Sequence, residues 1–329
     1  MMGQLIKLQD YVSRYEQNIF HYPSRFVLLK KQQWEKLRNL WESPNEITFF
    51  TQATQQNGIL EEDEKHPYLK KIKSVFTRRK ETEQKPTFSH DHGELETDKS
   101  DMFEAFPTFF HRAETMDDLK QQFLNQLFDF QMKWATSTLM EKSFIDKQYY
   151  YEEHLKFFLQ RFPDTYLVLY QPIFLLKKAS IELETILISP TDVWCISFLE
   201  QRNESVFLGS NEKFWHVKYK DKEEKRISPM IALNRTSKIV KKIFQLQEID
   251  LPIHKVLLSR NGFIDYPSAP FDTKLVDKRE FEEWFQSLRR LRTPLKHIQL
   301  NGAKALLQYC QTTSIRRMEW EVINKKEDS

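Results

Sequence analysis

The stretch TYLVLYQPIFLLKKASIELETILISPTDVWCISFLEQRNE, residues 165–204, decides the fold of this chain. It holds the longest concentration of β-branched, aromatic and leucine residues in the sequence, and such residues favour strands. Three apolar runs within it, Tyr166–Tyr170, Ile181–Ile188 and Val193–Leu199, predict strands. Pro190–Asp192 predicts a tight turn between the last two, because proline presets φ and aspartate favours turns.

Helices and strands alternate around this stretch. A helix over about Asp146–Phe162 is expected before it, and a strand over Lys213–Tyr219 after it. Then follow a charged turn over Lys220–Arg226, a helix with Ser228 as cap and Pro229 at its first position, a strand over Leu251–Ser259 and a helix with a capping-box-like start at Asp277–Glu280. This order predicts an α/β (α+β) fold, with a mixed sheet flanked by helices.

The N-terminal region is expected to be mainly helical. Residues 4–20 place Leu5, Leu8, Val12, Tyr15 and Ile19 at spacings of three and four, which predicts an amphipathic helix. A second helix is predicted over about Ser24–Trp41. A third begins after Thr115 as N-cap and is expected to reach about Met140.

The chain divides into five segments by composition. Residues 77–101 carry many charges of both signs and almost no apolar side chains, so they cannot bury enough surface to offset the entropy of ordering. We expect an N-terminal helical region (1–76), this charged and disordered linker (77–101), a connecting helix (102–145), the α/β domain (146–292) and a C-terminal helical tail (293–329).

Composition excludes several classes of protein. The 329 residues include only 6 glycines, and neither a dinucleotide-binding G-x-G-x-x-G nor a P-loop is present. The net charge of +3 neither requires nor excludes nucleic acid, so local patches must decide. No stretch suits a signal peptide or a transmembrane helix, and we therefore expect a cytoplasmic protein without membrane contact.

Cysteine and histidine give little sign of metal or redox chemistry. Cys195 and Cys310 lie far apart, with no disulfide framework or zinc spacing, and Cys195 is expected to be a reduced core residue. His90 and His92 lie in the charged segment without further ligands nearby, and we interpret them as solvated loop residues.

Residues 146–292 resemble the nuclease-related domain family, NERD, of the restriction-endonuclease-like group. The resemblance lies in the order of the acidic helix YYYEEHLKFFL (149–159), the strand pair IELETILISPTDVWCI (181–196), the helix SPMIALNRTSKIVKKIF (228–244) and the strand LPIHKVLLS (251–259). It implies a restriction-endonuclease-like mixed sheet. It also implies a D…(D/E)-x-K site, in which carboxylates on neighbouring strands hold Mg²⁺ and the metal activates water. The composition resembles that of bacterial proteins of the Firmicute type.

The resemblance places this site residue by residue. The helix acid would be Glu152 or Glu153, and the first strand acid Glu184, with Glu182 on the same strand face. The second acid falls on Ser197, the lysine on Leu199 and the family's glutamine near Ala232. The motif is therefore expected to be degenerate.

A displaced version of the motif remains possible three residues later, at Glu200 and Arg202. The odd shift puts Glu200 on the opposite strand face unless a bulge intervenes. In this version Glu153, Glu184, Glu200 and Arg202 would be catalytic, and Glu184 and Glu200 would hold Mg²⁺. Otherwise Glu184 is an exposed or ion-paired strand residue, and no cofactor is implied.

Three functions stay open. The first is a degenerate nuclease-like module that binds nucleic acid or regulates, using Arg235, Lys238, Lys241 and Lys242, with Arg289, Arg290, Arg292 and Lys296 further on. The second is a scaffold in which the aromatic-rich N-terminal helices bind a protein partner. The third is an active, Mg²⁺-dependent nuclease with the displaced site. We rank them in this order.

Overall fold

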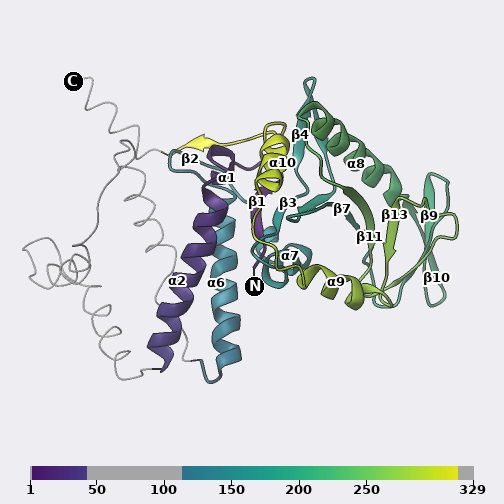
Figure 1. Ribbon diagram of the computed structural model, residues 1–329. Helices are drawn as coiled ribbons and strands as arrows, with labels where there is room; N and C mark the ends of the chain where they lie inside the picture. The colour runs from purple at the N-terminus through teal and green to yellow at the C-terminus, as the bar shows by residue number, and fades with distance from the viewer. Residues whose placement is uncertain (1, 43–112, 318–329) are drawn as a thin grey trace, which may run out of the picture. The chain divides into compact units, whose positions relative to one another are not determined.

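The computed structural model describes residues 2–42 and 113–317 of the chain (Figure 1). The chain forms two compact units. The first consists of residues 1–30 and 110–329, and the second of residues 31–109. Of the second unit, only the C-terminal part of helix α2 is described. The predicted linker, with His90 and His92, lies outside the described residues.

A six-stranded mixed sheet forms the centre of the first unit. β1 and β3 are parallel, β6 runs antiparallel to both β3 and β7, and β7, β11 and β13 are parallel to one another. The order across the sheet is β1 (Gln4–Leu8), β3 (Leu167–Tyr170), β6 (Thr185–Ile188), β7 (Val193–Phe198), β11 (Ile253–Leu258) and β13 (Thr273–Val276). The middle strands are almost fully buried, so the sheet carries the core.

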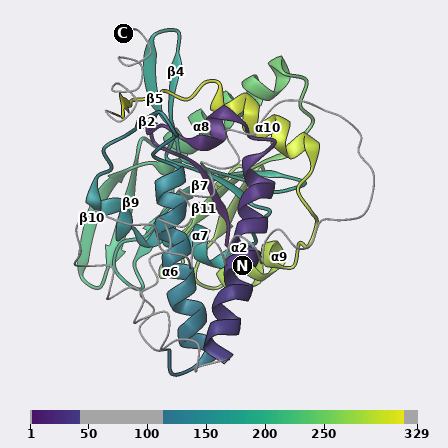
Figure 2. The same ribbon diagram turned by 90° about the vertical axis from the view of Figure 1, so that its left-hand side faces the viewer.

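Smaller sheets surround the central one. A four-stranded sheet has the order β10 (Lys222–Ile227), β9 (Phe214–Tyr219), β8 (Val206–Leu208) and β12 (Phe263–Asp265). β4 (Ile173–Leu176) and β5 (Ala179–Glu182) form a hairpin, and β2 (Glu141–Lys142) pairs with β14 (Ile315–Arg316). The β4–β5 hairpin projects beyond the central sheet in both views (Figures 1 and 2).

Helices cover both faces of the central sheet. α8 (Pro229–Leu246) and α10 (His297–Leu307) pack on one face, against β6, β7 and β11. α7 (Glu153–Arg161) and α9 (Phe281–Arg289) pack on the other face, as Figure 1 shows. α6 (Met116–Trp134) contacts α7 and β1, and the short helices α1 (Arg14–Gln17) and η1 (Lys147–Tyr150) complete the unit, together with the first part of α2 (Tyr22–Glu42).

Aromatic side chains hold α7 and α9 to their face of the sheet. The ring of Phe285 on α9 lies 5.3 Å from that of Phe157 and 5.4 Å from that of Phe162. Phe158 on α7 meets Phe198 of β7 edge to face at 5.5 Å. Since successive residues of a strand point to opposite faces, Phe198 faces α7 while Ser197 faces α8.

The predicted fold class is confirmed: a mixed sheet flanked by helices, with helices in the N-terminal region. The runs Tyr166–Tyr170 and Val193–Leu199 are strands β3 and β7, and Cys195 is a buried, free cysteine. Thr115 caps α6 in a full capping box, although α6 ends at Trp134 and not near Met140. No helix among the described residues is long and apolar enough to cross a membrane.

The predicted helix over residues 4–20 is wrong. Gln4–Leu8 form strand β1, and only Arg14–Gln17 are helical. The helical spacing of Leu5, Leu8 and Val12 is misleading, because all five residues of β1 are buried and the strand pairs with β3, far along the chain. Even the ammonium of Lys7 is buried, where it pairs with Glu16 and donates to Thr312 Oγ1 at 3.0 Å.

Two further predictions on strands need correction. The run Ile181–Ile188 is not continuous, because β5 ends at Glu182 and β6 begins at Thr185. The charged segment Lys220–Arg226 is largely strand β10, which pairs with β9 in regular register from Lys222 to Ile227. Its side chains are exposed because β10 is an edge strand, where charged residues are common.

The other two predicted helix starts differ in detail: Ser228 is the N-cap of α8 but does not cap through its side chain, and the N-cap of α9 is Glu280. Ser228 precedes α8, but its side chain makes no capping hydrogen bond, and its backbone N–H donates to the Lys213 carbonyl at 2.9 Å. Asp277 does not cap α9, which starts at Phe281. Its carboxylate accepts from the Arg279 guanidinium at 2.6 Å and from the Ile264 N–H at 3.2 Å.

Candidate nucleic-acid interface and the adjoining cavity

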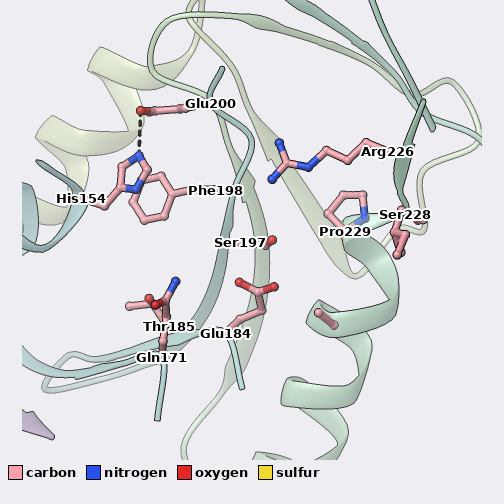
Figure 3. A pocket seen from close by; sticks show the side chains of 12 residues that line it. His154, Gln171, Glu184, Thr185, Ser197, Phe198, Glu200, Arg226, Ser228 and Pro229 are labelled. Carbon is pink, nitrogen blue, oxygen red and sulfur yellow. Dashed lines mark hydrogen bonds and ion pairs between the residues drawn. The ribbon is translucent and has the colours of Figure 1, made fainter. Parts of the chain in front are cut away.

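A cavity of about 360 Å³ opens where β6 and β7 approach the start of α8 (Figure 3). Side chains from five elements converge on it. They are His154 of α7, Gln171 after β3, Glu184 and Thr185 at the start of β6, Ser197 and Phe198 of β7 with Glu200 just beyond, and Arg226, Ile227, Ser228, Pro229 and Ala232 around the β10–α8 connection.

Glu184 lies at the interruption between β5 and β6, and helix α8 holds it there. Its backbone N–H donates to Thr236 Oγ1 at 2.9 Å, and the Arg235 guanidinium donates to the Glu182 carbonyl at 2.9 Å. Thr236 is fully buried, so this contact satisfies a backbone group that the strand ladder leaves open. The Glu184 carboxyl points into the cavity (Figure 3).

Burial raises the pKa of the Glu184 carboxyl to about 7. A hydrogen bond with Ser197 lowers this pKa and the charge of Glu182 raises it. The cations Arg235 and Arg226 lower it again, but burial remains the dominant effect. A carboxyl with this pKa exchanges its proton near neutral pH.

Ser197 lies opposite Glu184 on the neighbouring strand. β6 and β7 are antiparallel with Thr185 opposite Ile196, so Glu184, one residue before Thr185, is next to Ser197. Ser197 is 4% exposed and turns its hydroxyl to Glu184. A hydroxyl therefore stands at the position where the resemblance expects the second acid, and Leu199 at the lysine position is 1% exposed.

Glu200 lies on the opposite wall of the cavity and is fully engaged. The Arg260 guanidinium donates to its two carboxylate oxygens at 2.5 and 2.7 Å, and the Arg260 backbone N–H donates at 3.0 Å. Burial acts to raise the pKa of Glu200, but the hydrogen bonds from Arg260 and His154 outweigh burial and lower it to about 2. Glu200 is thus a permanent anion in an ion pair.

His154 is held between two carboxylates. Its Nε2 lies 2.9 Å from Glu200 Oε2, and its Nδ1 lies 3.1 Å from Glu152 Oε1. Its ring stacks on Phe198 at 4.0 Å. Since both ring nitrogens face a carboxylate, His154 acts as a structural bridge between α7 and the end of β7.

The structure brings Glu184 and Glu200 to one cavity but leaves the other two expected site residues outside it. Glu153 is the first residue of α7 and is exposed. Glu152, the alternative, is the N-cap of α7. Arg202 is exposed, and its guanidinium lies 5.3 Å from the centre of the Tyr219 ring.

Sequence reasoning missed three residues of the cavity: His154 as a partner of Glu200, Arg226 and Gln171. The sequence predicts a turn at Arg226, and the run of charged residues in β10 gives no alternation that would indicate a strand. Gln171 adopts a positive φ of 45°, and a glutamine in the sequence does not predict this backbone conformation. These contacts join segments far apart in the chain.

The donor set does not fit a divalent metal. Mg²⁺ is held by oxygen ligands, usually carboxylates with waters. Among residues 2–42 and 113–317, no group of three or more His, Cys, Asp or Glu side chains could hold a metal ion. Glu200 turns its carboxylate to His154 and Arg260, so its oxygens are already engaged.

The expected nucleic-acid residues form an exposed basic face on α8. Arg235, Lys238 and Lys242 follow at spacings of three and four, which places them on one side of the helix, and Lys241 lies beside them. No Asp or Glu occurs among the 18 residues of α8. Arg289 is the last residue of α9, on the opposite face of the central sheet, whereas Lys296 is the N-cap of α10, which packs on the same face as α8.

The basic face and the cavity meet at Arg235 and Thr236, where α8 holds the strand that carries Glu184. Comparison with known protein families identifies the segment of the chain that carries both features. Residues 147–259 match the nuclease-related domain, NERD. The predicted resemblance is therefore confirmed. The NERD segment begins just before α7 and ends just after β11, so it contains the whole cavity and the basic face.

A curated relative gives a more specific likeness over part of the chain. An RNA 2',3'-cyclic phosphodiesterase from Geobacillus stearothermophilus is 32% identical over 130 residues. The matched segment covers 40% of this chain and 36% of the relative, so the chain spans about a third of that protein's length. No solved structure matches the chain.

Proposed function

We propose that this nuclease-related domain protein binds nucleic acid through the basic face of α8 and does not cleave it by a metal-dependent reaction. The basic face carries the proposal: Arg235, Lys238, Lys241 and Lys242 are all exposed, and no acid of α8 offsets them. Cations in such an array bind backbone phosphates and release counterions, which is the main source of affinity for nucleic acid.

The neighbouring cavity supports binding without metal-dependent cleavage. A two-carboxylate site would need Glu200, whose oxygens are held by Arg260 and His154, or an acid at the position of Ser197. Glu184 alone cannot complete the coordination of a hard cation. Arg226 on the cavity wall can bind a phosphate of the nucleic acid, since a guanidinium donates hydrogen bonds in a geometry that matches phosphate oxygens.

A test measures binding and cleavage in the same samples. Single- and double-stranded DNA and RNA are titrated by mobility shift, with Mg²⁺, with Mn²⁺ and with chelator. The variant Arg235→Ala/Lys238→Ala/Lys242→Ala removes three cations from the face. We expect the slope of log affinity against log salt to fall by about one per cation removed.

The matched control removes three exposed lysines from the β9–β10 hairpin, Lys220→Ala/Lys222→Ala/Lys225→Ala. It changes the net charge equally and should leave the slope within about one unit of wild type. If the slope falls equally in both variants, the change in net charge explains the effect and the α8 face does not. Chelator-sensitive cleavage abolished by Glu184→Ala or Glu200→Ala would contradict the proposal. Absence of both binding and cleavage would favour the protein-scaffold function instead.

A second candidate function, metal-independent opening of a cyclic phosphodiester, is favoured by one observation. A carboxyl with a pKa of about 7 faces a cavity that also holds Arg226, so an acid and a cation are available together. The relative named as an RNA 2',3'-cyclic phosphodiesterase is consistent with this chemistry. Turnover of a 2',3'-cyclic-phosphate oligonucleotide in chelator, lost in Glu184→Gln, would support it.

A further inference from the structure

A second cavity, of about 270 Å³, lies beside the first around the start of α8. Ser228 lines both cavities and so separates them. The second cavity lies between the connection before β9, the first turns of α8 and the loop after β12. Its main side chains are Asn211, Lys213, Ile231, Asn234, Tyr266 and Pro270.

Two amide side chains of this cavity have their oxygens occupied and their NH₂ groups available. Asn211 Oδ1 accepts from the Tyr266 hydroxyl at 3.0 Å, and Asn234 Oδ1 accepts from Lys255 Nζ at 2.8 Å. In the described part of the chain, neither NH₂ group donates to the cavity's other side chains. Two fixed amide donors suit a ligand whose edge carries hydrogen-bond acceptors.

The lining of the cavity is mixed, and its aromatic part is held in place. The Tyr266 ring meets Trp215 edge to face at 4.8 Å, and a Cβ added at Gly209 would lie 2.5 Å from that ring, so Tyr266 is closely packed. Ile231 on the opposite wall is 47% exposed. Phe271 follows the lining residue Pro270 in the chain and is fully exposed, at 112%.

The lining of this cavity carries one cation and one anion, and further cations lie around it. Lys213 lines it, and Arg235 follows Asn234 at the start of the basic face. Asp272 beside Phe271 is neutralised by Lys255, whose Nζ lies 2.8 Å from Asp272 Oδ1. Glu212 is the acid among its lining residues, and Arg226 lies across Ser228 in the first cavity.

We propose that the second cavity binds an unpaired nucleobase of single-stranded nucleic acid. Asn211 and Asn234 donate to acceptor atoms on the edge of the base, and Phe271 stacks on its face. This proposal rests on the proposed function, since the basic face of α8 holds the adjoining phosphates. Bases within a duplex are stacked and paired, so they cannot enter, whereas unpaired bases stack readily on aromatic side chains.

The test compares single-stranded and duplex oligonucleotides of equal length by fluorescence anisotropy with the full chain. Phe271→Ala should weaken single-strand binding about tenfold, the size of one lost base–aromatic stack, and leave duplex binding within about twofold. Asn211→Asp keeps an acceptor for Tyr266 but removes the amide donor, so it should lower the single-strand to duplex affinity ratio. Phe144→Ala, at another exposed aromatic (75%), is the control and should change neither affinity.

A probe with one abasic position, moved along a twelve-nucleotide strand, provides a second readout. Wild type should lose affinity at one or a few positions, and Phe271→Ala should lose this position dependence. If the ratio of affinities is unchanged in Phe271→Ala and Asn211→Asp, the nucleobase cavity is refuted. The proposed function still stands in that case, provided that the triple α8 variant weakens both ligands. If the triple variant changes neither, the proposed function fails as well.

Discussion

Two glutamates face the same cavity and behave in opposite ways. The pKa of Glu184 is raised to about 7, while the pKa of Glu200 is lowered to about 2. Both side chains are largely buried, so burial alone does not separate them. Glu184 meets a serine hydroxyl across the sheet, whereas Glu200 meets a bidentate guanidinium and an imidazole.

The difference shows that the two walls of the cavity have different tasks. On the wall formed by α7 and the end of β11, the charged groups make structural contacts. Glu200 binds both Arg260, after β11, and His154 of α7. The β6–β7 wall leaves one carboxyl free to take up or release a proton. A pair of metal-binding carboxylates would require both walls to present unpaired anions, and only one wall has a carboxyl to offer.

The largest expected effect comes from breaking the Glu200 ion pair. Arg260→Leu leaves a buried carboxylate without its guanidinium, which should lower the free energy of unfolding by about 3–5 kcal/mol. Urea denaturation measures this loss. The double variant Glu200→Leu/Arg260→Leu removes both charges and should recover most of the stability. A loss below about 1 kcal/mol in Arg260→Leu would mean that the pair is solvated.

A second test uses acid titration of stability to distinguish the Glu200 wall of the cavity from the Glu184 wall. The pKa of Glu200 is below its ordinary value of 4.5 in the folded chain, so its contribution is present above pH 4.5 and is lost as pH falls towards 2. Glu200→Gln should therefore be less stable than wild type at pH 6, with a smaller loss of stability on acidification. Parallel stability curves for the two proteins would contradict the lowered pKa.

The opposite sign is expected at Glu184. Its folded pKa of about 7 exceeds its ordinary value of 4.5, so its neutral form favours folding below pH 4.5, and that stability is lost as pH rises through 7. Glu184→Gln keeps a neutral side chain at all pH values. The variant should match wild type at pH 4.5 and exceed its unfolding free energy by about 2 kcal/mol at pH 8. Glu182→Gln, at an exposed neighbour, is the control.

A smaller effect tests how α8 positions the free carboxyl. Thr236→Val removes the acceptor for the Glu184 backbone N–H and should cost about 1–2 kcal/mol of stability. Ser237→Ala, on the same helix, is the control and should stay within about 0.5 kcal/mol. Thermal unfolding measures both. If Thr236→Val is neutral, the strand interruption at Glu184 does not depend on α8.

The smallest effect concerns ligand binding. Ionised Glu184 repels phosphate bound at Arg226, so the affinity of wild type for nucleic acid should fall about threefold between pH 6 and pH 8. In Glu184→Gln this pH dependence should be flat. Anisotropy titrations at constant ionic strength compare the two proteins. An equal fall in both would assign the effect to other groups.

Patterns that are local in the sequence predicted much of the fold. The apolar runs at β3 and β7, the Pro229 start of α8 and the Thr115 cap of α6 each depend on residues within a few positions. β1 could not be predicted in this way. All five residues of β1 are buried and the strand pairs with β3, so the spacing of Leu5, Leu8 and Val12 does not indicate a helix.

The same limit applies to the cavity. The resemblance pointed to Glu184 and to the serine at the second acid position, and both lie together on adjacent strands. The role of Glu200 could not be read from the sequence. Its ion pair with Arg260 spans 60 residues, and its contact with His154 spans 46. Long-range partners, and not residue type, determine which carboxylate remains free.

The pairing of β1 with β3 also has a consequence for biosynthesis. Gln4 leaves the ribosome well before its partner Leu167, which follows 163 positions later in the chain. Until β3 has been synthesised, the backbone N–H and C=O groups of β1 have no partner strand, and an unpaired strand is prone to aggregation. A fragment restricted to residues 147–259 has the complementary problem, because the edge of β3 stays open. We therefore expect chaperone dependence in the full chain and poor solubility in that fragment, both for the same reason.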